Sequence, residues 1–480
     1  MILLLWESYL NNIIQKLKRQ GYSHPIFTSF VFIILGINLF AHRPIQIINA
    51  VSLKPDINYS LHLNSIRYFL EPIVGFPLFY LRSGDPVEEY IVLWIWIFFC
   101  VGVYFIYSYG IKFYEKWLLS IPAILGLAYF ILVWMIFWPL PSNTIVNESK
   151  SKILFNTHAH SYFSHDGLIT PAEQMNWHKN NGFDAFFLTE HNHNLKTLDL
   201  VQQQRNGQLT QNPHVMAGIE YSGSNHMVLL GLTDSLITFG KKDSVVIPEV
   251  HRQGGVVGVA HWFDGQKMSI NYYINLGVNG YEIVNKNQLA YPKSIHHDII
   301  DACENNKMFL LGGADYHGYG PTCGTWNVLD IFDWQDLSHV EKTESIMNGL
   351  KDGKTQVIYY SDRNIISFEN IWLSPLLNIM NYFKGLNIFQ IISWIGWGVL
   401  FISLGIKINK KFILQWVPLI TGSIIIIKGR ILLEKSISVV QQNDVLVEFG
   451  DLFTVIGCGF ILSGIIVWGL LKKFPSIIPD

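Results

Sequence analysis

The sequence predicts an α/β domain, a (β/α) TIM-like barrel, inserted between two groups of transmembrane α-helices. Long apolar runs without Asp, Glu, Lys or Arg lie before Ser142 and after Leu373. Between them, short apolar strands alternate with helical segments, and polar residues follow the strands at their carboxyl ends. This is the layout of a barrel whose site lies at one face. The expected parts are residues 1–149, 150–373 and 374–480.

Composition supports a membrane protein rather than a nucleic-acid-binding one. The 480 residues are 50% hydrophobic and only 15% charged, well below the usual quarter. The net charge is −2 and no basic block stands out, so binding to a nucleic-acid duplex is not expected. The four cysteines show no metal-type spacing, and the sequence leaves open a disulfide between Cys303 and Cys323.

Six apolar segments are predicted to span the bilayer. Four contain no charged residue and approach or exceed the roughly 20 residues that a crossing needs: 91–111, 117–140, 385–406 and 452–471. Two shorter ones lie at 26–41 and 412–427. The segment 66–81 carries Arg67 and Glu71, so we expect an interfacial or re-entrant helix there.

The placement of basic residues predicts the orientation. With six spans, the basic N-terminal region and the segments 112–116, 407–411 and 472–473 fall on one side. An excess of Lys and Arg in short loops is typical of the cytoplasmic side. We therefore expect an integral protein of a bacterial inner or plasma membrane with its α/β domain outside the cytoplasm. The lipid bilayer is an expected partner, and the sequence leaves protein partners open.

Within the polar domain, capping residues predict both the start and the end of the first helix. Thr170 is placed as N-cap, Pro171 in the first turn and Glu173 three residues after the cap, and Gly182 suits the C-terminal end. Apolar strands then end in or begin with ligand-type residues. These strands are 152–155, 186–188, 215–219, 227–230, 256–260, 281–284 and 308–311.

Histidines cluster in this domain. Of the 17 histidines, all but His24, His42, His62 and His339 lie between His158 and His317. Imidazole is the commonest protein metal ligand, and residues two apart on a strand point to one face. The pairs at the ends of two strands, His158 with His160 and Asp315 with His317, therefore predict a metal-dependent hydrolase site. We expect five other histidines to be solvated or locally capping residues: His178, His214, His251, His296 and His297.

Seven short motifs resemble, in order and spacing, those of the polymerase and histidinol phosphatase (PHP) phosphoesterases. They are His158-Ala159-His160, His165-Asp166-Gly167, Thr189-Glu190-His191, Gly218-Ile219-Glu220, His226, His261 and Asp315-Tyr316-His317. The resemblance covers about residues 152–362 and implies a distorted barrel with a trinuclear metal site. Three residues depart from the family pattern, Asn156, Glu190 and Trp262, and one residue is inserted before Asp166.

The resemblance implies nine metal ligands: His158, His160, Asp166, His191, Glu220, His226, His261, Asp315 and His317. Because of the insertion, either Asp166 or His165 fills the second motif. Imidazole and carboxylate ligands suit two or three divalent ions, Mn²⁺, Zn²⁺ or Fe²⁺, with Glu220 as a bridge.

Clustered ions can activate water as a hydroxide for attack on a phosphomonoester or phosphodiester. His193 or His165 is expected to protonate the leaving oxygen, and Arg252 or Lys267 to hold the phosphate. One alternative is a non-catalytic extracytoplasmic sensor that binds metal or ligand and is coupled to the helices. A transporter ranks last. It would need charged or polar residues that face one another within the bilayer, and the predicted spans contain almost none.

Overall fold

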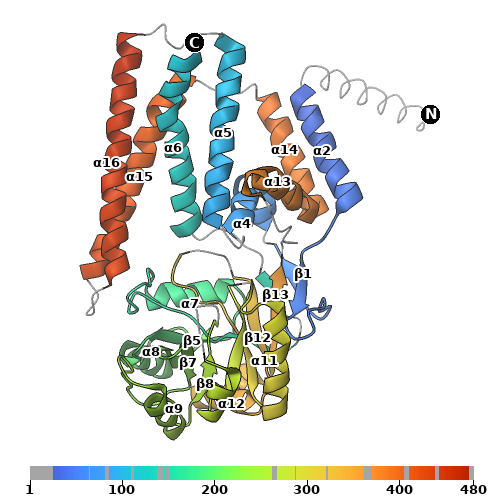
Figure 1. Ribbon diagram of the computed structural model, residues 1–480, viewed down its shortest axis with the longest axis vertical. Helices are drawn as coiled ribbons and strands as arrows, with labels where there is room; N and C mark the ends of the chain where they lie inside the picture. The colour runs from blue at the N-terminus through green and yellow to red at the C-terminus, as the bar shows by residue number, and fades with distance from the viewer. Residues whose placement is uncertain are drawn as a thin grey trace, which may run out of the picture.

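The computed structural model divides into a group of long helices and an α/β domain placed end to end (Figure 1). It describes residues 25–63, 65–81, 86–109, 113–137, 144–147, 149, 151–261, 268–286, 288–319, 323–361, 370–404, 410–437 and 443–474. The helices that flank the α/β domain in the sequence lie together on one side of it. The α/β domain is thus inserted in the sequence between two helical regions that form one group in the structure.

One mixed sheet of eleven strands forms the centre of the α/β domain. In spatial order these are β1 (Gln46–Asn49), β13 (Gln356–Ser361), β12 (Thr325–Asp330), β4 (Lys152–Asn156), β5 (Ala185–His191), β6 (His214–Ser222), β7 (His226–Leu230), β8 (Val256–Val259), β9 (Gly280–Asn285) and β10 (Gln288–Leu289), while β11 (Phe309–Gly313) pairs with β9. A second sheet pairs β2 (Ser60–His62) with β3 (Thr144–Val146). The edge strand β1 comes from the region before residue 150.

The predicted TIM-like (β/α) barrel is not confirmed, because the sheet is curled but mixed. Strands β4, β5 and β6 are parallel, whereas β7 is antiparallel to both β6 and β8. Only residues 223–225 separate β6 from β7, and a parallel crossover needs a dozen or more. The sheet nevertheless curls back on itself: after β11, Tyr316 forms a parallel bridge with Ala159, and the amide of Asp315 donates to the carbonyl of His158 at 2.8 Å.

Helices cover the outside of this sheet. They are α7 (Pro171–Asn180), α8 (Leu195–Arg205), α9 (Asp243–Arg252), α10 (Ile270–Asn275), α11 (Lys293–Asn306) and α12 (His339–Lys351), with a 3-10 turn at Trp334–Asp336. The expected caps of α7 are confirmed. Thr170 and Glu173 form a reciprocal capping box, and Gly182 has a φ of +79°.

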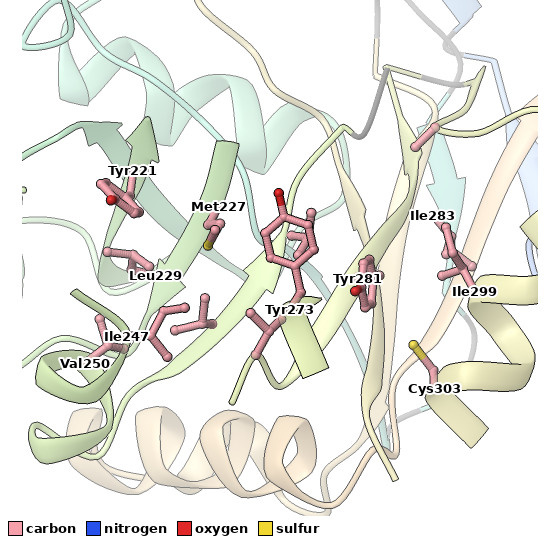
Figure 2. Close-up of a cluster of buried hydrophobic side chains, with 14 of the residues drawn as sticks. Tyr221, Met227, Leu229, Ile247, Val250, Tyr273, Tyr281, Ile283, Ile299 and Cys303 are labelled. Carbon is pink, nitrogen blue, oxygen red and sulfur yellow. The ribbon is translucent and has the colours of Figure 1, made fainter. Parts of the chain in front are cut away.

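An apolar core lies between the sheet and its helices (Figure 2). Ile247 of α9, Tyr273 of α10 and Ile299 of α11 are all fully buried in it. Cys303 of α11 also packs here, and both Cys303 and Cys323 are free thiols, so the disulfide left open by the sequence is not formed. This core holds β6, β8 and β9 in place, three of the strands whose ends carry ligand-type residues.

Among the residues that the structure describes, four helices are long and apolar enough to cross a membrane: α5 (Pro86–Tyr109), α6 (Phe113–Phe137), α15 (Lys410–Ile437) and α16 (Asp444–Lys473). They correspond to the predicted spans 91–111, 117–140, 412–427 and 452–471. The predicted span 385–406 contains α14 (Ile388–Ser403), which is long enough to cross only together with Ile371–Gly385, a segment that includes α13 (Ser374–Gly385) and from which α14 is bent by 117°. This pair is either a broken span or a re-entrant loop. The predicted span 26–41 is the shorter apolar helix α2 (Pro25–Ala41).

Residues 66–81 do not form one continuous span. They are broken into α3 (Ser65–Phe69), a π-helical turn (Glu71–Gly75) and α4 (Phe76–Leu81). Buried Arg67 pairs with fully buried Glu71, and Gln390 of α14 donates to the same carboxylate at 2.9 Å. A buried charge is tolerated when it is paired and hydrogen-bonded, and this network ties the broken segment to α14.

The α15–α16 pair packs through glycines. A Cβ on Gly422 would lie 2.6 Å from the carbonyl oxygen of Gly457, and one on Gly429 would lie 2.7 Å from that of Gly450. Small residues let the two backbones approach closely. Helix α15 also runs ten residues beyond the predicted end at 427, because its later lysines find partners: Lys428 lies 5.1 Å from the Phe137 ring and Lys435 pairs with Glu173 of α7 at 2.9 Å.

Candidate metal centre

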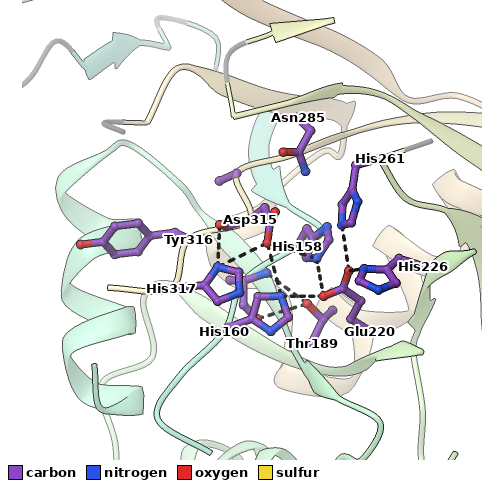
Figure 3. A network of polar contacts seen from close by, with 12 residues as sticks. His158, His160, Thr189, Glu220, His226, His261, Asn285, Asp315, Tyr316 and His317 are labelled. Atoms are coloured by element: carbon purple, nitrogen blue, oxygen red, sulfur yellow. Dashed lines mark hydrogen bonds and ion pairs between the residues drawn. The ribbon is translucent and has the colours of Figure 1, made fainter. Parts of the chain in front are cut away.

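Strand ends bring the ligand-type side chains together at the concave face of the curled sheet. His158 and His160 follow β4, His191 ends β5, His261 follows β8, and Asp315 and His317 follow β11. Glu220 lies near the end of β6, and His226 begins antiparallel β7 at the same edge. Figure 3 shows the imidazoles of His158, His160, His226 and His261 turned toward the Glu220 carboxylate.

These side chains form three adjacent groups, each with one ligand atom per residue and all atoms within 4.8 Å of one another. The groups are His160, Asp166, His191 and His317; then His158, His160, Glu220 and Asp315; and then Glu220, His226 and His261. His160 belongs to the first two groups and Glu220 to the last two. The site is therefore one continuous cluster rather than three separate ones.

Glu220 is the centre of the cluster. Its Oε2 lies 3.2 Å from His158 Nε2, 3.0 Å from His160 Nε2 and 3.4 Å from His191 Nδ1. Its Oε1 lies 2.8 Å from His226 Nδ1 and 2.9 Å from His261 Nε2. One carboxylate thus faces five imidazoles through both of its oxygens, as a bridging ligand would.

Two aspartates complete the cluster. Asp166 Oδ2 lies 3.1 Å from both His191 Nε2 and His317 Nε2. Asp315 Oδ1 lies 3.4 Å from His160 Nε2, and its other oxygen pairs with Lys286 at 2.8 Å. Asp315 and Lys286 both have positive φ angles, 48° and 47°. Left-handed backbone at non-glycine residues is costly and concentrates at functional sites.

The electrostatics favour ionised carboxylates. Burial would raise the pKa of Glu220, but the neighbouring His158 and His191 outweigh it and hold the pKa well below its ordinary value. The pKa of Asp315 is likewise lowered, with His158 and Lys286 overcoming the effect of burial. Burial lowers the pKa of His160 to about 4, and the adjacent His317 and His191 act in the same direction. A neutral His160 has a lone pair free to coordinate a cation.

The donor set fits divalent cations. Several buried ligand atoms lie near carboxylates or imidazoles, yet they form no acceptable hydrogen bond to any residue that the structure describes: His158 Nε2, His160 Nε2, Asp166 Oδ1, His191 Nδ1 and Asp315 Oδ1. Buried polar atoms are rarely left in this way unless water or an ion satisfies them. Converging imidazole and carboxylate donors suit Zn²⁺, Mn²⁺ or Fe²⁺.

Further buried residues orient the imidazoles. Glu282 on β9 lies 3.0 Å from His158 Nδ1 and itself accepts from Asn285 at 2.7 Å. Ser164 Oγ lies 3.1 Å from His160 Nδ1. Carboxylates that bind the second nitrogen of a metal-ligating histidine fix its tautomer and orientation. Sequence reasoning missed Glu282 and Lys286, although a glutamate inside the apolar strand 281–284 was a usable signal.

The structure brings all nine predicted ligands together, and their metal binding stays a prediction. Asp166, rather than His165, belongs to one of the three groups. His165 is exposed, with its ring 4.7 Å from that of His191. His193 forms a bridge with Ile237 and belongs to none of the groups.

The predicted substrate-binding role of Arg252 is not supported by its position. Arg252 is exposed on α9 and pairs with Glu249 of the same helix at 2.6 Å. An arginine placed i+3 from a glutamate on a helix surface is satisfied locally. Lys267 lies outside the described residues.

Three histidines expected to be solvated or capping are instead buried. Fully buried His178 stacks on Phe186 at 3.9 Å and lies 2.9 Å from the Asn156 amide. His296 lies 2.8 Å from the carbonyl oxygen of Ala50. His214 begins β6, at the end opposite Glu220, and its Nε2 lies 2.9 Å from Thr343 Oγ1. These rings are packing residues of the fold.

Acid is expected to destabilise the α/β domain through His214. Burial, reinforced by His339 and Lys342, lowers the pKa of His214 to about 3, against about 6.5 in an unfolded chain. Between these values the unfolded chain binds more protons, so the free energy of unfolding falls as the pH drops below 6.5. From pH 7.5 to 5.5 this group should cost about 1 kcal/mol. Thermal unfolding with chelator present should show a smaller acid-induced loss for His214→Gln than for wild type; equal losses would contradict the assignment.

Comparisons with known proteins find solved structures of low similarity to this chain. No protein-family model matches it, and no curated protein does. Similar solved structures include a two-domain protein from Bacteroides vulgatus described as containing a predicted PHP-like metal-dependent phosphoesterase, with 20% identity, a TM-score of 0.35, and coverage of 44% of this chain and 65% of that one.

Two further solved structures are similar. An amidohydrolase from Chromobacterium violaceum has 14% identity, a TM-score of 0.27, and coverage of 34% of this chain and 87% of that one. A protein from Bifidobacterium adolescentis, proposed to be a metal-dependent phosphoesterase, has 15% identity, a TM-score of 0.29, and coverage of 35% and 90%. The chain spans about 65% of the length of the first structure. At these TM-scores the likenesses carry no argument, and function must be inferred from the site itself.

Proposed function

We propose that this protein is a membrane-anchored, metal-dependent phosphoesterase that hydrolyses a phosphomonoester or a phosphodiester. The observation that carries the proposal is the sharing of His160 and Glu220 among three ligand groups. Such sharing is expected where two or three cations lie a few ångströms apart. Clusters of this kind recur in enzymes that act on phosphate esters.

Bound cations would supply Lewis acidity and lower the pKa of coordinated water to about 7. The chain's own residues would hold and neutralise them: Glu220 between groups, Asp166 and Asp315 at the sides. The side chains of His226 and Asp166 are 34% and 23% exposed, so they mark the accessible side of the cluster. The ammonium of Lys286, beside Asp315, would bind an anionic substrate oxygen.

We propose that a histidine outside the ligand groups protonates the leaving oxygen. His165 is exposed and adjacent to the His191 ring, which favours it for this role. His193 is the second candidate. We retain no role for Arg252, since it is engaged with Glu249 on α9.

The α/β domain is proposed to lie outside the cytoplasm. Lys472 and Lys473 end α16 at the side of the helix group furthest from that domain (Figure 1). Basic residues at that end favour a cytoplasmic location for it.

The orientation can be tested by cysteine labelling. Cys303 is 1% exposed, so its thiol cannot report on which side of the membrane the domain lies. A cysteine introduced at exposed Arg252 should react with an impermeant maleimide from outside intact cells. Labelling only after lysis would show that the α/β domain faces the cytoplasm and would contradict the proposed orientation.

Activity assays test the reaction directly. Wild type, His158→Ala, Asp315→Ala and Arg252→Ala would be purified in detergent, loaded with Mn²⁺ or Zn²⁺, and assayed on a panel of phosphomonoesters and phosphodiesters. His158 and Asp315 share one ligand group, so each alanine should lower kcat by about 10³-fold if several kcal/mol of cation stabilisation is lost. Arg252→Ala should retain wild-type activity. Equal activity of all four proteins would refute the proposal.

A second candidate is a metal-holding sensor coupled to the helices. Contacts between residues 161–169, which include Asp166, and the ends of α15 and α16 favour this candidate. For example, Lys435 Nζ lies 3.4 Å from the Leu168 carbonyl oxygen. A sensor would bind metal in the same groups and show no turnover on any ester of the panel.

A further inference from the structure

Asp166 is carried by a loop with no regular secondary structure. We name residues 161–169 the Asp166 loop. On its inner side, Ser164 Oγ donates to fully buried Glu190 at 2.6 Å, and the Leu168 amide donates to the His317 carbonyl at 2.8 Å. Within the loop, the Ser164 carbonyl accepts a long bond from the Gly167 amide at 3.4 Å. The carbonyls of Ser164 and Gly167, on either side of Asp166, accept further bonds from outside the loop.

Asn443 satisfies them from the helix group. Its side-chain Nδ2 lies 2.7 Å from the Ser164 carbonyl, 2.7 Å from the Gly167 carbonyl and 3.2 Å from the Tyr162 carbonyl. Its Oδ1 accepts from the Leu446 amide at 2.8 Å, which makes it the N-cap of α16. Asn443 is only 2% exposed. One buried amide therefore joins the start of α16 to three carbonyls around a candidate ligand.

Other contacts bind the same two surfaces. Leu168 of the Asp166 loop packs in one apolar cluster with Leu446 and Phe453 of α16. The Tyr319 ring lies 5.8 Å from the His317 ring and 6.4 Å from the Phe449 ring of α16. Both the Asp166 and the His317 segments are thus backed by α16.

The α15–α16 hairpin that supports this contact is closely packed. Gly422 and Gly457, and Gly429 and Gly450, bring the backbones of α15 and α16 into close contact. Lys435 near the end of α15 pairs with Glu173 of α7. A hairpin packed at both its middle and its end can hold a loop that has no regular secondary structure.

We propose that Asn443 is a positioning residue for the metal group His160, Asp166, His191 and His317, which the α15–α16 hairpin completes by holding the Asp166 loop. The inference rests on the metal-binding part of the proposed function and not on the reaction. Partners that orient metal ligands commonly change metal affinity about 10–100-fold when removed. We expect that range here, confined to one group.

The decisive variant is Asn443→Asp, in the full chain. Aspartate caps a helix as well as asparagine does, so the bond to Leu446 is kept. It removes the amide donors and places a carboxylate oxygen beside three carbonyls. Asn387→Asp is the matched control, because Asn387 caps α14 in the same way and does not contact the Asp166 loop. Asp166→Asn serves as the benchmark for losing this group.

Metal content and affinity would be measured by elemental analysis and calorimetric titration with Mn²⁺, and exposure of the loop by hydrogen exchange. Asn443→Asp should lose the ion that Asp166→Asn loses, bind it about 10–100-fold more weakly, and exchange the amides of 161–169 faster. Asn387→Asp should match wild type. Asn443→Ser, which also keeps the cap, replaces Asn443→Asp should that protein not purify.

Wild-type metal content and wild-type exchange in Asn443→Asp would overturn the proposal, as would equal losses in Asn387→Asp. Phosphoester hydrolysis is assayed separately on wild type. An inactive wild type that binds its metals counts against the enzyme proposal, and the comparison of Asn443→Asp with Asn387→Asp still decides the positioning role.

Discussion

Glu220→Gln is expected to lower phosphoester hydrolysis by about 10³-fold or more and to remove metal from the protein. Both oxygens of Glu220 face imidazoles, five in all, and the residue is 1% exposed. Glutamine keeps the size but loses the charge, and it turns an amide N–H₂ toward these rings. If the lost Lewis acidity contributes several kcal/mol to the barrier, the rate falls by at least that factor.

The matched control for this variant is Glu249→Gln. Glu249 lies in the same domain on α9, and its carboxylate is engaged with Arg252 and Gln253. This variant should keep both metal and activity. Full metal content together with wild-type kcat in Glu220→Gln would show that the cluster does not work as described.

Chelation is expected to have the second large effect. Removing the cations should abolish hydrolysis and lower the melting temperature, and Mn²⁺ or Zn²⁺ should restore both. A ligand that binds only the folded chain stabilises it by about 4 kcal/mol per site at 1,000 times its dissociation constant. The groups include residues in or next to β4, β5, β6, β7, β8 and β11, so the whole sheet should respond.

Thermal unfolding of the detergent-solubilised protein with and without EDTA would measure this loss. Asp315→Ala provides the control, because a chain that lacks a shared ligand should show a smaller response to EDTA than wild type. An unchanged melting temperature and undiminished activity in wild type after complete chelation would contradict a role for metal.

Most of the ligand positions were predictable because they lie next to short apolar strands, whereas Asp166 lies in an irregular loop. Side-chain alternation makes His158 and His160 point to one face, and likewise Asp315 and His317. Glu220 and His261 follow the predicted apolar strands 215–219 and 256–260, whose apolar residues are buried. Local pattern therefore indicated these residues, the family resemblance completed the predicted ligand set, and the sheet places the strand ends at one edge.

Other features depended on tertiary contacts that no local pattern contains. The β6–β7 hairpin made the sheet mixed where alternation suggested parallel strands. Buried Glu282 supports His158 from a strand 124 residues further along the chain. His214 is buried because its ring packs on His339 and contacts the Thr343 hydroxyl. His178 is buried because its ring stacks on Phe186 and contacts the Asn156 amide.

The sequence pattern also did not predict the full length of α15. Lys428 and Arg430 follow the apolar run and suggested its end near 427. In the fold the helix continues to Ile437 because Lys428 packs on Phe137 and Lys435 reaches Glu173. The contact of Asn443 with the Asp166 loop depends on this extension, since α15 and α16 must both reach the α/β domain.

Elemental analysis of the purified full-length protein tests the central claim most directly. The three groups joined by His160 and Glu220 predict two or three equivalents of Mn, Zn or Fe per wild-type chain, reduced in Glu220→Gln and retained in Glu249→Gln. A wild-type chain that holds no divalent metal, even after incubation with each of the three ions, would contradict it.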